Sequence, residues 1–169
     1  VHDNQIYGLT KGQPSPTSDP CDLAHKTATC NMGAPFNPLL IAIAAGATFV
    51  ARSFSGDKTH LAQIMAAAIR HPGYALVDIL QPCVSFNKTN TFAYYKQRVK
   101  PLDDHYDPTN KLAAIETAMQ FGDIIPIGIL YQEPAPTYAD KRPELFDTVP
   151  LVDKQVPLSD VQALINSYI

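Results

Sequence analysis

Apolar runs and helix-start signals alternate through the first half of the chain. Asn37 followed by Pro38 predicts the start of a helix, with Asn as the N-cap, and Gly46 predicts its end. The residues between them are apolar on every side, so we expect this helix to be buried. The run "ATFVARS", residues 47–53, is rich in β-branched and aromatic residues and predicts a short strand.

A second helix and a second strand follow directly. Asp57 is positioned to cap a helix over residues 58–70, which "HPG" at 71–73 ends. The apolar run "YALVDIL", residues 74–80, is typical of a strand that is buried on both faces. Helices alternating with buried strands predict an α/β fold with a mostly parallel sheet and helices on both faces.

The chain changes character after this strand. Residues 87–108 are polar, aromatic and irregular, and we expect no regular element in them. A helix is predicted over residues 110–120. Residues 124–132, "IIPIGILYQ", predict one more strand, and Pro126 places that strand at a sheet edge or at its own start.

The C-terminal residues predict an extended arm. Residues 133–144 are rich in proline, and "LSDVQALINSYI" predicts a closing helix capped by Ser159. We therefore divide the chain into an α/β part, residues 1–123, and a C-terminal part, residues 124–169, made of a strand, a Pro-rich arm and a terminal helix.

Composition and charge restrict the class of protein. Of the 169 residues, 46% are hydrophobic, which is enough for an ordinary core. Only 17% are charged, against about 25% in typical domains, so we expect part of the surface to be covered by other protein. The net charge of −3 argues against non-specific binding of nucleic acid, which requires a basic face.

The cysteines and the apolar runs indicate a cytoplasmic location. Cys21, Cys30 and Cys83 are odd in number and lack the short spacings of a secreted disulfide framework. Residues 1–20 contain no apolar segment typical of a signal peptide. The most apolar run, residues 38–50, is too short to span a bilayer, so we expect no membrane association.

The first twenty residues look like the end of a strand followed by a loop rich in Gly and Pro. In open α/β sheets, ligands bind at the carboxyl ends of the strands. The segment after Val1–Asp3 is therefore the first candidate for a binding site.

The same segment carries a family resemblance. "DNQIYGLTKGQPSPT", residues 3–17, resembles the thiamine-diphosphate loop in the β subunit of 2-oxoacid:ferredoxin oxidoreductases. That family usually has Asn where this chain has Asp3. The resemblance continues through "PFNPLLIAIAAGATFVARSFSGD", "AAAIRHPGYALVDILQPCVSFNKTNT" and "IPIGILYQEPAPTY", and so covers nearly the whole chain.

The resemblance implies an activity and a set of partners. The intact enzyme would use thiamine diphosphate and Mg²⁺ to decarboxylate a 2-oxoacid oxidatively. It would pass electrons through a 4Fe-4S cluster to ferredoxin and release an acyl-coenzyme A. The resemblance also implies an α subunit that faces the aminopyrimidine half of the cofactor, and hence a hetero-oligomer.

The resemblance further implies that this chain is the C-terminal portion of the subunit. The family's Gly-Asp-Gly segment, whose Asp binds the metal, is not in this chain. The cofactor sites would then be incomplete, and we expect the chain in isolation to be inactive.

Site residues follow from the resemblance position by position. The side-chain oxygen of Asn4 and the backbone carbonyl of Ile6 would bind Mg²⁺, and the backbone of Gly8 and Leu9 would approach the diphosphate. Thr10 would support the cofactor as a polar side chain, together with Gln13. Taken without the surrounding motif, Asn4 is more typical of an ordinary turn at a strand end.

Lys11 and Cys83 are the candidates for chemistry beyond cofactor binding. Lys11 would neutralise the substrate carboxylate or stabilise charge during decarboxylation, although a solvated loop lysine is the commoner case. Cys83 corresponds to a thiolate ligand of the family's 4Fe-4S cluster, whereas a lone cysteine is usually a small buried hydrophobe. Cys21 and Cys30 do not fall at the family's ligand positions.

Two other interpretations stay open at this point. The chain could be an inactive folded module with a structural or assembly role. It could also come from another thiamine-diphosphate-dependent decarboxylase, although that class needs no cysteine at position 83.

Overall fold

The computed structural model describes residues 1–20, 31–146 and 149–168, so Cys21 and Cys30 lie outside the described residues. The chain divides into two compact units, Val1–Ala135 and Pro136–Ile169. The sequence predicted a division between residues 123 and 124. The first unit instead extends to Ala135, because the strand Ile125–Gln132 lies inside its sheet.

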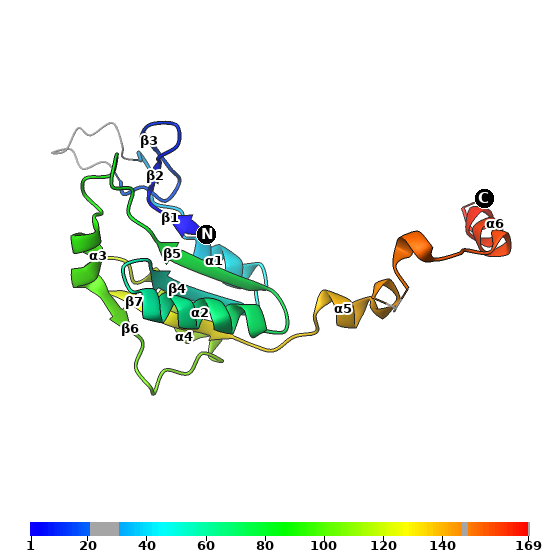
Figure 1. The fold of residues 1–169 in the computed structure, drawn as a ribbon. Helices are drawn as coiled ribbons and strands as arrows, with labels where there is room; N and C mark the ends of the chain where they lie inside the picture. The colour runs from blue at the N-terminus through cyan, green and yellow to red at the C-terminus, as the bar shows by residue number, and fades with distance from the viewer. Residues whose placement is uncertain (21–30, 147–148, 169) are drawn as a thin grey trace. The chain divides into compact units, whose positions relative to one another are not determined.

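Among the described residues, a five-stranded sheet forms the centre of the first unit (Figure 1). Three of the four neighbouring strand pairs are parallel, and only β4 and β7 run antiparallel, which confirms the mostly parallel sheet. In spatial order the strands are β1 (His2–Asp3), β5 (Ala75–Leu80), β4 (Phe49–Phe54), β7 (Ile125–Gln132) and β6 (Val99–Pro101).

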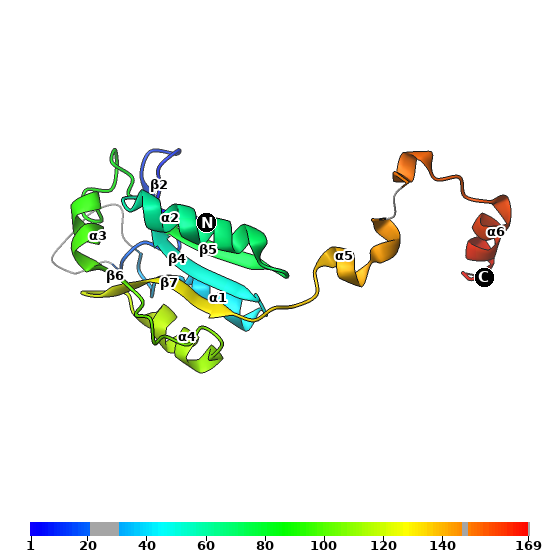
Figure 2. The ribbon, with the colours of Figure 1, turned by 60° about the horizontal axis from the view of Figure 1, so that its bottom comes forward.

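Helices cover both faces of the sheet, as predicted. Figure 2 shows α2 (Lys58–Arg70) on one face and α4 (Lys111–Met119) on the other. Helix α1 (Pro38–Ala44) packs on the same face as α4, where both contribute to one apolar core. The core beneath α2 contains Phe49, Ala51, Ile64, Val77 and Ile79.

Local capping explains where the helices begin. The Asn37 side chain accepts hydrogen bonds from Leu39 N and Leu40 N, both at 3.1 Å, and Gly46 adopts a left-handed φ of 89° just after α1. Asp57 Oδ1 accepts from His60 N at 3.0 Å at the start of α2. The predicted bounds of α2, residues 58–70, are confirmed.

Two predictions about helices were wrong. Helix α1 is not buried on every side, because Ile41 is 54% exposed while Leu39 and Ile43 are fully buried. Ser159 does not cap the terminal helix: its Oγ bonds Asp160 Oδ1 at 3.2 Å, and Pro157 occupies the N-cap position.

The segment predicted to be irregular, residues 87–108, contains two elements. These are α3 (Phe92–Arg98) and strand β6. The helix is capped by Thr91, whose side chain accepts from Tyr94 N. Tyr95 anchors the helix in a small core formed with Phe54, Leu80 and Ile125.

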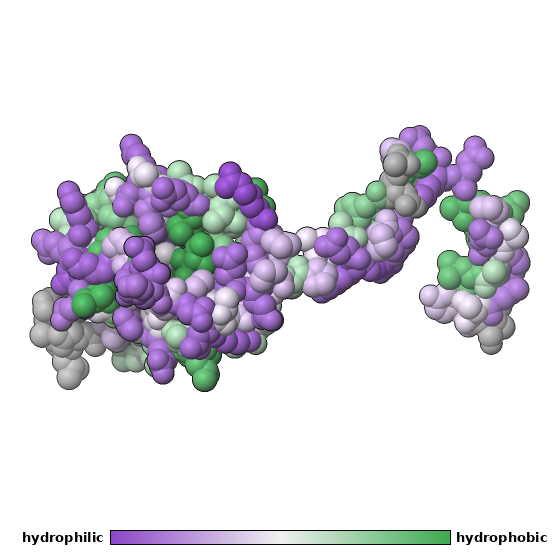
Figure 3. Space-filling view, turned by 90° about the horizontal axis from the view of Figure 1, so that it is seen from below, coloured by the Kyte–Doolittle hydropathy of each residue, from purple (hydrophilic) through white to green (hydrophobic). Residues whose placement is uncertain are grey.

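The second unit is made of short helices. Its elements are α5 (Tyr138–Lys141), the 3₁₀ turns Pro143–Leu145 and Leu151–Asp153, and α6 (Leu158–Asn166). Apolar side chains of α6, including Leu158 and Leu164, remain exposed (Figure 3). None of the helices in the part of the chain that the structure describes could cross a membrane.

Candidate functional site

The N-terminal loop, residues 4–16, follows the short edge strand β1. Strands β2 (Ile6–Tyr7) and β3 (Gln13–Pro14) pair antiparallel and hold the loop as a hairpin. At its tip, Lys11 adopts a left-handed φ of 76° and Gly12 one of 111°. Backbone hydrogen bonds from Lys11 N to Gly8 O and from Gly12 N to Tyr7 O close the tip.

The loop lies against the segment that follows β5. A Cβ atom built on Gly8 would stand only 3.1 Å from Cys83 Sγ, so glycine allows this close approach. Asn87 Nδ2 donates to Asn4 O at 3.3 Å and ties the same two segments together. The fold thus brings Asn4, Gly8 and Cys83 together, although Cys83 follows Gly8 by 75 positions in the chain.

Asn4 and Ile6 offer hard oxygen atoms at the base of the loop. Asn4 Oδ1 accepts a hydrogen bond from Ile6 N at 3.1 Å, and the Ile6 carbonyl accepts from Gly8 N at 3.0 Å. Each oxygen has a second lone pair, and hard oxygen ligands are those that Mg²⁺ requires. The residues present therefore fit the Mg²⁺–diphosphate group that the motif implies.

The remaining loop candidates lie at the exposed tip. Leu9 is 99% exposed, and Lys11 is exposed as well. Thr10 Oγ1 donates to Gln13 Oε1, so the two predicted polar supports bond each other. Lys11 therefore lies at the surface, outside the core.

Cys83 by itself does not make an iron–sulfur centre. It is a half-buried free thiol, not the fully buried small hydrophobe that lone cysteines usually are. Within the described ranges, no group of three or more His, Cys, Asp or Glu residues could hold a metal ion. A four-cysteine cluster would need further ligands from outside these ranges.

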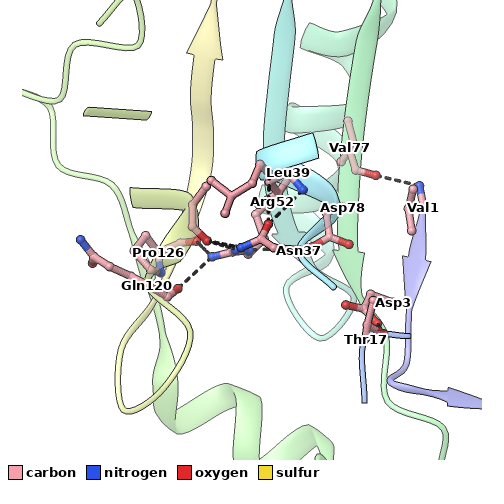
Figure 4. Close-up of polar contacts among 12 residues, drawn as sticks. Val1, Asp3, Thr17, Asn37, Leu39, Arg52, Val77, Asp78, Gln120 and Pro126 are labelled. Carbon is pink, nitrogen blue, oxygen red and sulfur yellow. Dashed lines mark hydrogen bonds and ion pairs between the residues drawn. The ribbon is translucent and has the colours of Figure 1, made fainter. Parts of the chain in front are cut away.

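A buried charge cluster beneath the loop was missed by sequence reasoning. Arg52 on β4 and Asp78 on β5 are register partners and are each 2% exposed (Figure 4). Their closest side-chain atoms, Nε and Oδ2, are 3.8 Å apart. The sequence held a signal, because each residue is the one charged residue of a largely apolar strand, but only the strand register shows that the two are partners.

Arg52 secures the end of α4. Its Nη2 donates to Ala118 O at 3.0 Å, and its Nη1 donates to Gln120 O at 3.2 Å and to Pro126 O at 3.4 Å. Asn37 Nδ2 also donates to Ala118 O, at 2.9 Å. The Ala118 carbonyl lies in the last turn of α4 and lacks a partner within the helix, and a cation near a helix C-terminus is favourable. Figure 4 shows the guanidinium turned toward Gln120 and Pro126.

A cavity of about 370 Å³ separates the loop from this cluster. Asp3 at the end of β1 and Gln5 in the loop line it on one side, and Arg52 and Asp78 line it from β4 and β5. Gln5 Oε1, Arg52 Nε and Asp78 Oδ1 are buried with no hydrogen-bond partner in the structure. Buried polar atoms are rarely unpaired, so this polar cavity suits ordered water.

Burial and the neighbouring Asp3 raise the pKa of Asp78 to about 7, although Arg52 opposes the shift. Because the pKa in the unfolded chain is near 3.8, the unfolded state releases this proton at lower pH. The contribution of Asp78 to the free energy of unfolding is therefore fully present below about pH 4, and it is lost as the pH rises through about 7.

We expect the free energy of unfolding to fall between about pH 4 and about pH 7, with a shallower fall in Asp78→Asn. Urea denaturation across this range would measure both slopes. Identical slopes in the variant and the wild type would contradict the prediction.

Family models match both parts of this site. Residues 1–79, which contain the N-terminal loop, match the model for the C-terminal TPP-binding domain of thiamine pyrophosphate enzymes. Residues 83–147, which begin at Cys83, match the model for the C-terminal region of the pyruvate ferredoxin oxidoreductase β subunit.

Relatives give the same result over nearly the whole chain. The β subunit of 2-oxoacid:ferredoxin oxidoreductase from Saccharolobus solfataricus is 39% identical over 98% of this chain and 61% of its own length. The corresponding subunit from a Sulfolobus species is 38% identical over 95% of this chain and 59% of its own length. The chain thus spans about three fifths of these curated relatives.

A solved structure shares the fold. It is 2-oxoglutarate:ferredoxin oxidoreductase from Magnetococcus marinus, with 2-oxoglutarate, coenzyme A and succinyl-CoA bound. The similarity has a TM-score of 0.79 and 38% identity, and covers 96% of this chain and 56% of that chain. From the two adjoining family matches, the relatives and the shared fold, we conclude that this chain belongs to the family of 2-oxoacid:ferredoxin oxidoreductase β subunits.

Proposed function

We propose that this chain forms part of an enzyme that converts a 2-oxoacid and coenzyme A to an acyl-coenzyme A and CO₂, with two electrons passed to ferredoxin. The observation that carries the proposal is the close approach of Gly8, in the cofactor motif, to the Cys83 thiol. The groups proposed to bind the decarboxylating cofactor and to receive its electrons are thus adjacent. The alternative of another thiamine-diphosphate decarboxylase gives no role to this cysteine.

The N-terminal loop would hold the cofactor through its oxygen atoms and backbone. Asn4 and Ile6 would each supply one oxygen to Mg²⁺, and the missing acidic ligand would come from elsewhere in a longer subunit. Gly8 and Leu9 would present the backbone to the diphosphate, with Thr10 as a polar support. Thiamine diphosphate supplies the carbon nucleophile that decarboxylation of a 2-oxoacid requires.

Lys11 and Cys83 would serve steps other than cofactor binding. Lys11, exposed at the tip of the loop, would hold the carboxylate of the 2-oxoacid by charge. Cys83 would provide one thiolate of a 4Fe-4S cluster, whose other ligands would lie outside the described residues. An α subunit would complete the site, and ferredoxin would be the external electron acceptor in the cytoplasm.

The test is an assay of the complete β subunit assembled with its α subunit. Ferredoxin reduction should require a 2-oxoacid, coenzyme A, Mg²⁺ and thiamine diphosphate together, and the protein should contain iron. Reduction that proceeds without coenzyme A, or an iron-free assembly, would contradict the proposal. An assembly that binds neither cofactor nor iron would favour the structural-module interpretation.

A further inference from the structure

A buried polar contact closes the base of the N-terminal loop. Asp3 Oδ1 accepts two hydrogen bonds, from Thr17 Oγ1 at 2.6 Å and from Gln5 N at 3.1 Å. Asp3 is 6% exposed, and Figure 4 shows Asp3 and Thr17 side by side. The first bond joins residues fourteen positions apart, so the loop between them is closed into a ring.

A second contact secures the same turn from the other side. Ser18 Oγ donates to Gln5 O and accepts from Ser15 N at 2.8 Å. Gln5 is therefore held at both its backbone N–H, by Asp3, and its backbone carbonyl, by Ser18. Both serines are buried, so solvent cannot easily replace these bonds.

The residue held in this way has an unfavourable backbone conformation. Gln5 has a φ of 55°, in the left-handed region that residues with a side chain rarely adopt. Such a conformation persists only where surrounding contacts compensate for it. Gln5 lies between Asn4 and Ile6, and its backbone angles set the relative directions of the Asn4 side chain and the Ile6 carbonyl.

We propose that Asp3 and Thr17 are positioning residues for the Mg²⁺–diphosphate site, because their hydrogen bond holds the turn at Gln5 that aims Asn4 and Ile6 at the metal. This inference rests on the proposed function, which supplies the ligand, Mg²⁺ with thiamine diphosphate. The family motif usually has Asn at this position, and an Asn side chain offers the same oxygen to Gln5 N and Thr17 Oγ1. The acceptor oxygen, and not the charge, is the property that the position requires.

The experiment uses the complete β subunit assembled with its α subunit. Asp3→Ala and Thr17→Val each remove one partner of the bond, Asp3→Asn keeps the acceptor, and Asp107→Ala is the matched control. Asp107 Oδ1 likewise accepts from a backbone N–H and a threonine hydroxyl on an exposed turn, but both belong to the nearby Thr109, at 2.9 Å and 2.7 Å.

The first readout is the affinity for thiamine diphosphate in the presence of Mg²⁺, measured by calorimetry. We expect Asp3→Ala and Thr17→Val each to weaken the binding of thiamine diphosphate about tenfold. The double variant should bind about as well as the weaker-binding of the two single variants, because both substitutions remove the same hydrogen bond. Asp3→Asn and Asp107→Ala should bind as the wild type does. The value of kcat at saturating cofactor should stay near that of the wild type in the control Asp107→Ala.

The second readout needs no cofactor. Amide hydrogen exchange of residues 4–16 should be faster in Asp3→Ala and Thr17→Val than in the wild type, and unchanged in Asp3→Asn. The positioning role would be overturned if Asp3→Ala left both the exchange rates and the affinity for thiamine diphosphate unchanged. It would also be overturned if Asp107→Ala weakened the affinity as much as Asp3→Ala does. Wild-type protein that exchanges slowly here but binds no thiamine diphosphate would overturn the proposed function instead.

Discussion

Cys83→Ser is expected to lower ferredoxin reduction by the assembled enzyme about 100-fold or more, because loss of a metal ligand should cost at least as much as loss of a residue that orients one. A serine hydroxyl at this position stays protonated near neutral pH and is a poor ligand for iron. The substitution leaves the fold intact in our expectation, since Cys83 is only half-buried and differs from Ser by one atom.

Three measurements together test this prediction. Ferredoxin reduction, iron content and visible absorbance should all fall in Cys83→Ser, while the affinity for thiamine diphosphate should change little. Val84→Ala is the matched control, because Val84 is the next residue and is 69% exposed. Full activity and full iron content in Cys83→Ser would show that this thiol is not a cluster ligand.

Arg52→Ala is expected to lower the free energy of unfolding by about 3–5 kcal/mol. The variant removes the donor to the carbonyls of Ala118, Gln120 and Pro126 and leaves Asp78 buried without its cation. Arg52 is also one of the largest fully buried side chains among the described residues, so its removal enlarges the cavity beneath the loop.

Urea denaturation of the purified β subunit measures this loss. Arg70→Ala is the control, because Arg70 lies exposed in the last turn of α2 and should contribute less than about 1 kcal/mol. The double variant Arg52→Ala/Asp78→Ala should be less destabilised than the two single losses added together, since neither member of the buried pair is then left without its partner. Additive losses would show that the two residues act independently.

Helix boundaries were predictable wherever a local signal sets them. Asp57 at one end and "HPG" at the other set the bounds of α2, and Asn37 with Pro38 set the start of α1. The segment 87–108 was not predictable in the same way, because its helix is only seven residues long and depends on the packing of Tyr95. Short helices gain most of their stability from such tertiary contacts.

The candidate site was predictable only in part. The motif from Asp3 to Thr17 identified the loop, and its continuation identified Cys83 as a separate candidate. That Asp3 and Thr17 bond each other, or that Arg52 lies opposite Asp78, could not be read from sequence spacing. Both pairs depend on register and loop closure, which are properties of the assembled sheet.

The sequence by itself determined the class of fold, the starts of α1 and α2 and the family motif, because capping residues, apolar periodicity and motif identity act over a few neighbouring positions. Only the tertiary structure decided the order of the strands, the contact of Gly8 with Cys83 and the buried cluster around Arg52. The reason is physical: hydrogen bonds between strands and desolvated charges join residues far apart in the chain, and they take their strength from burial that exists only once the sheet has formed.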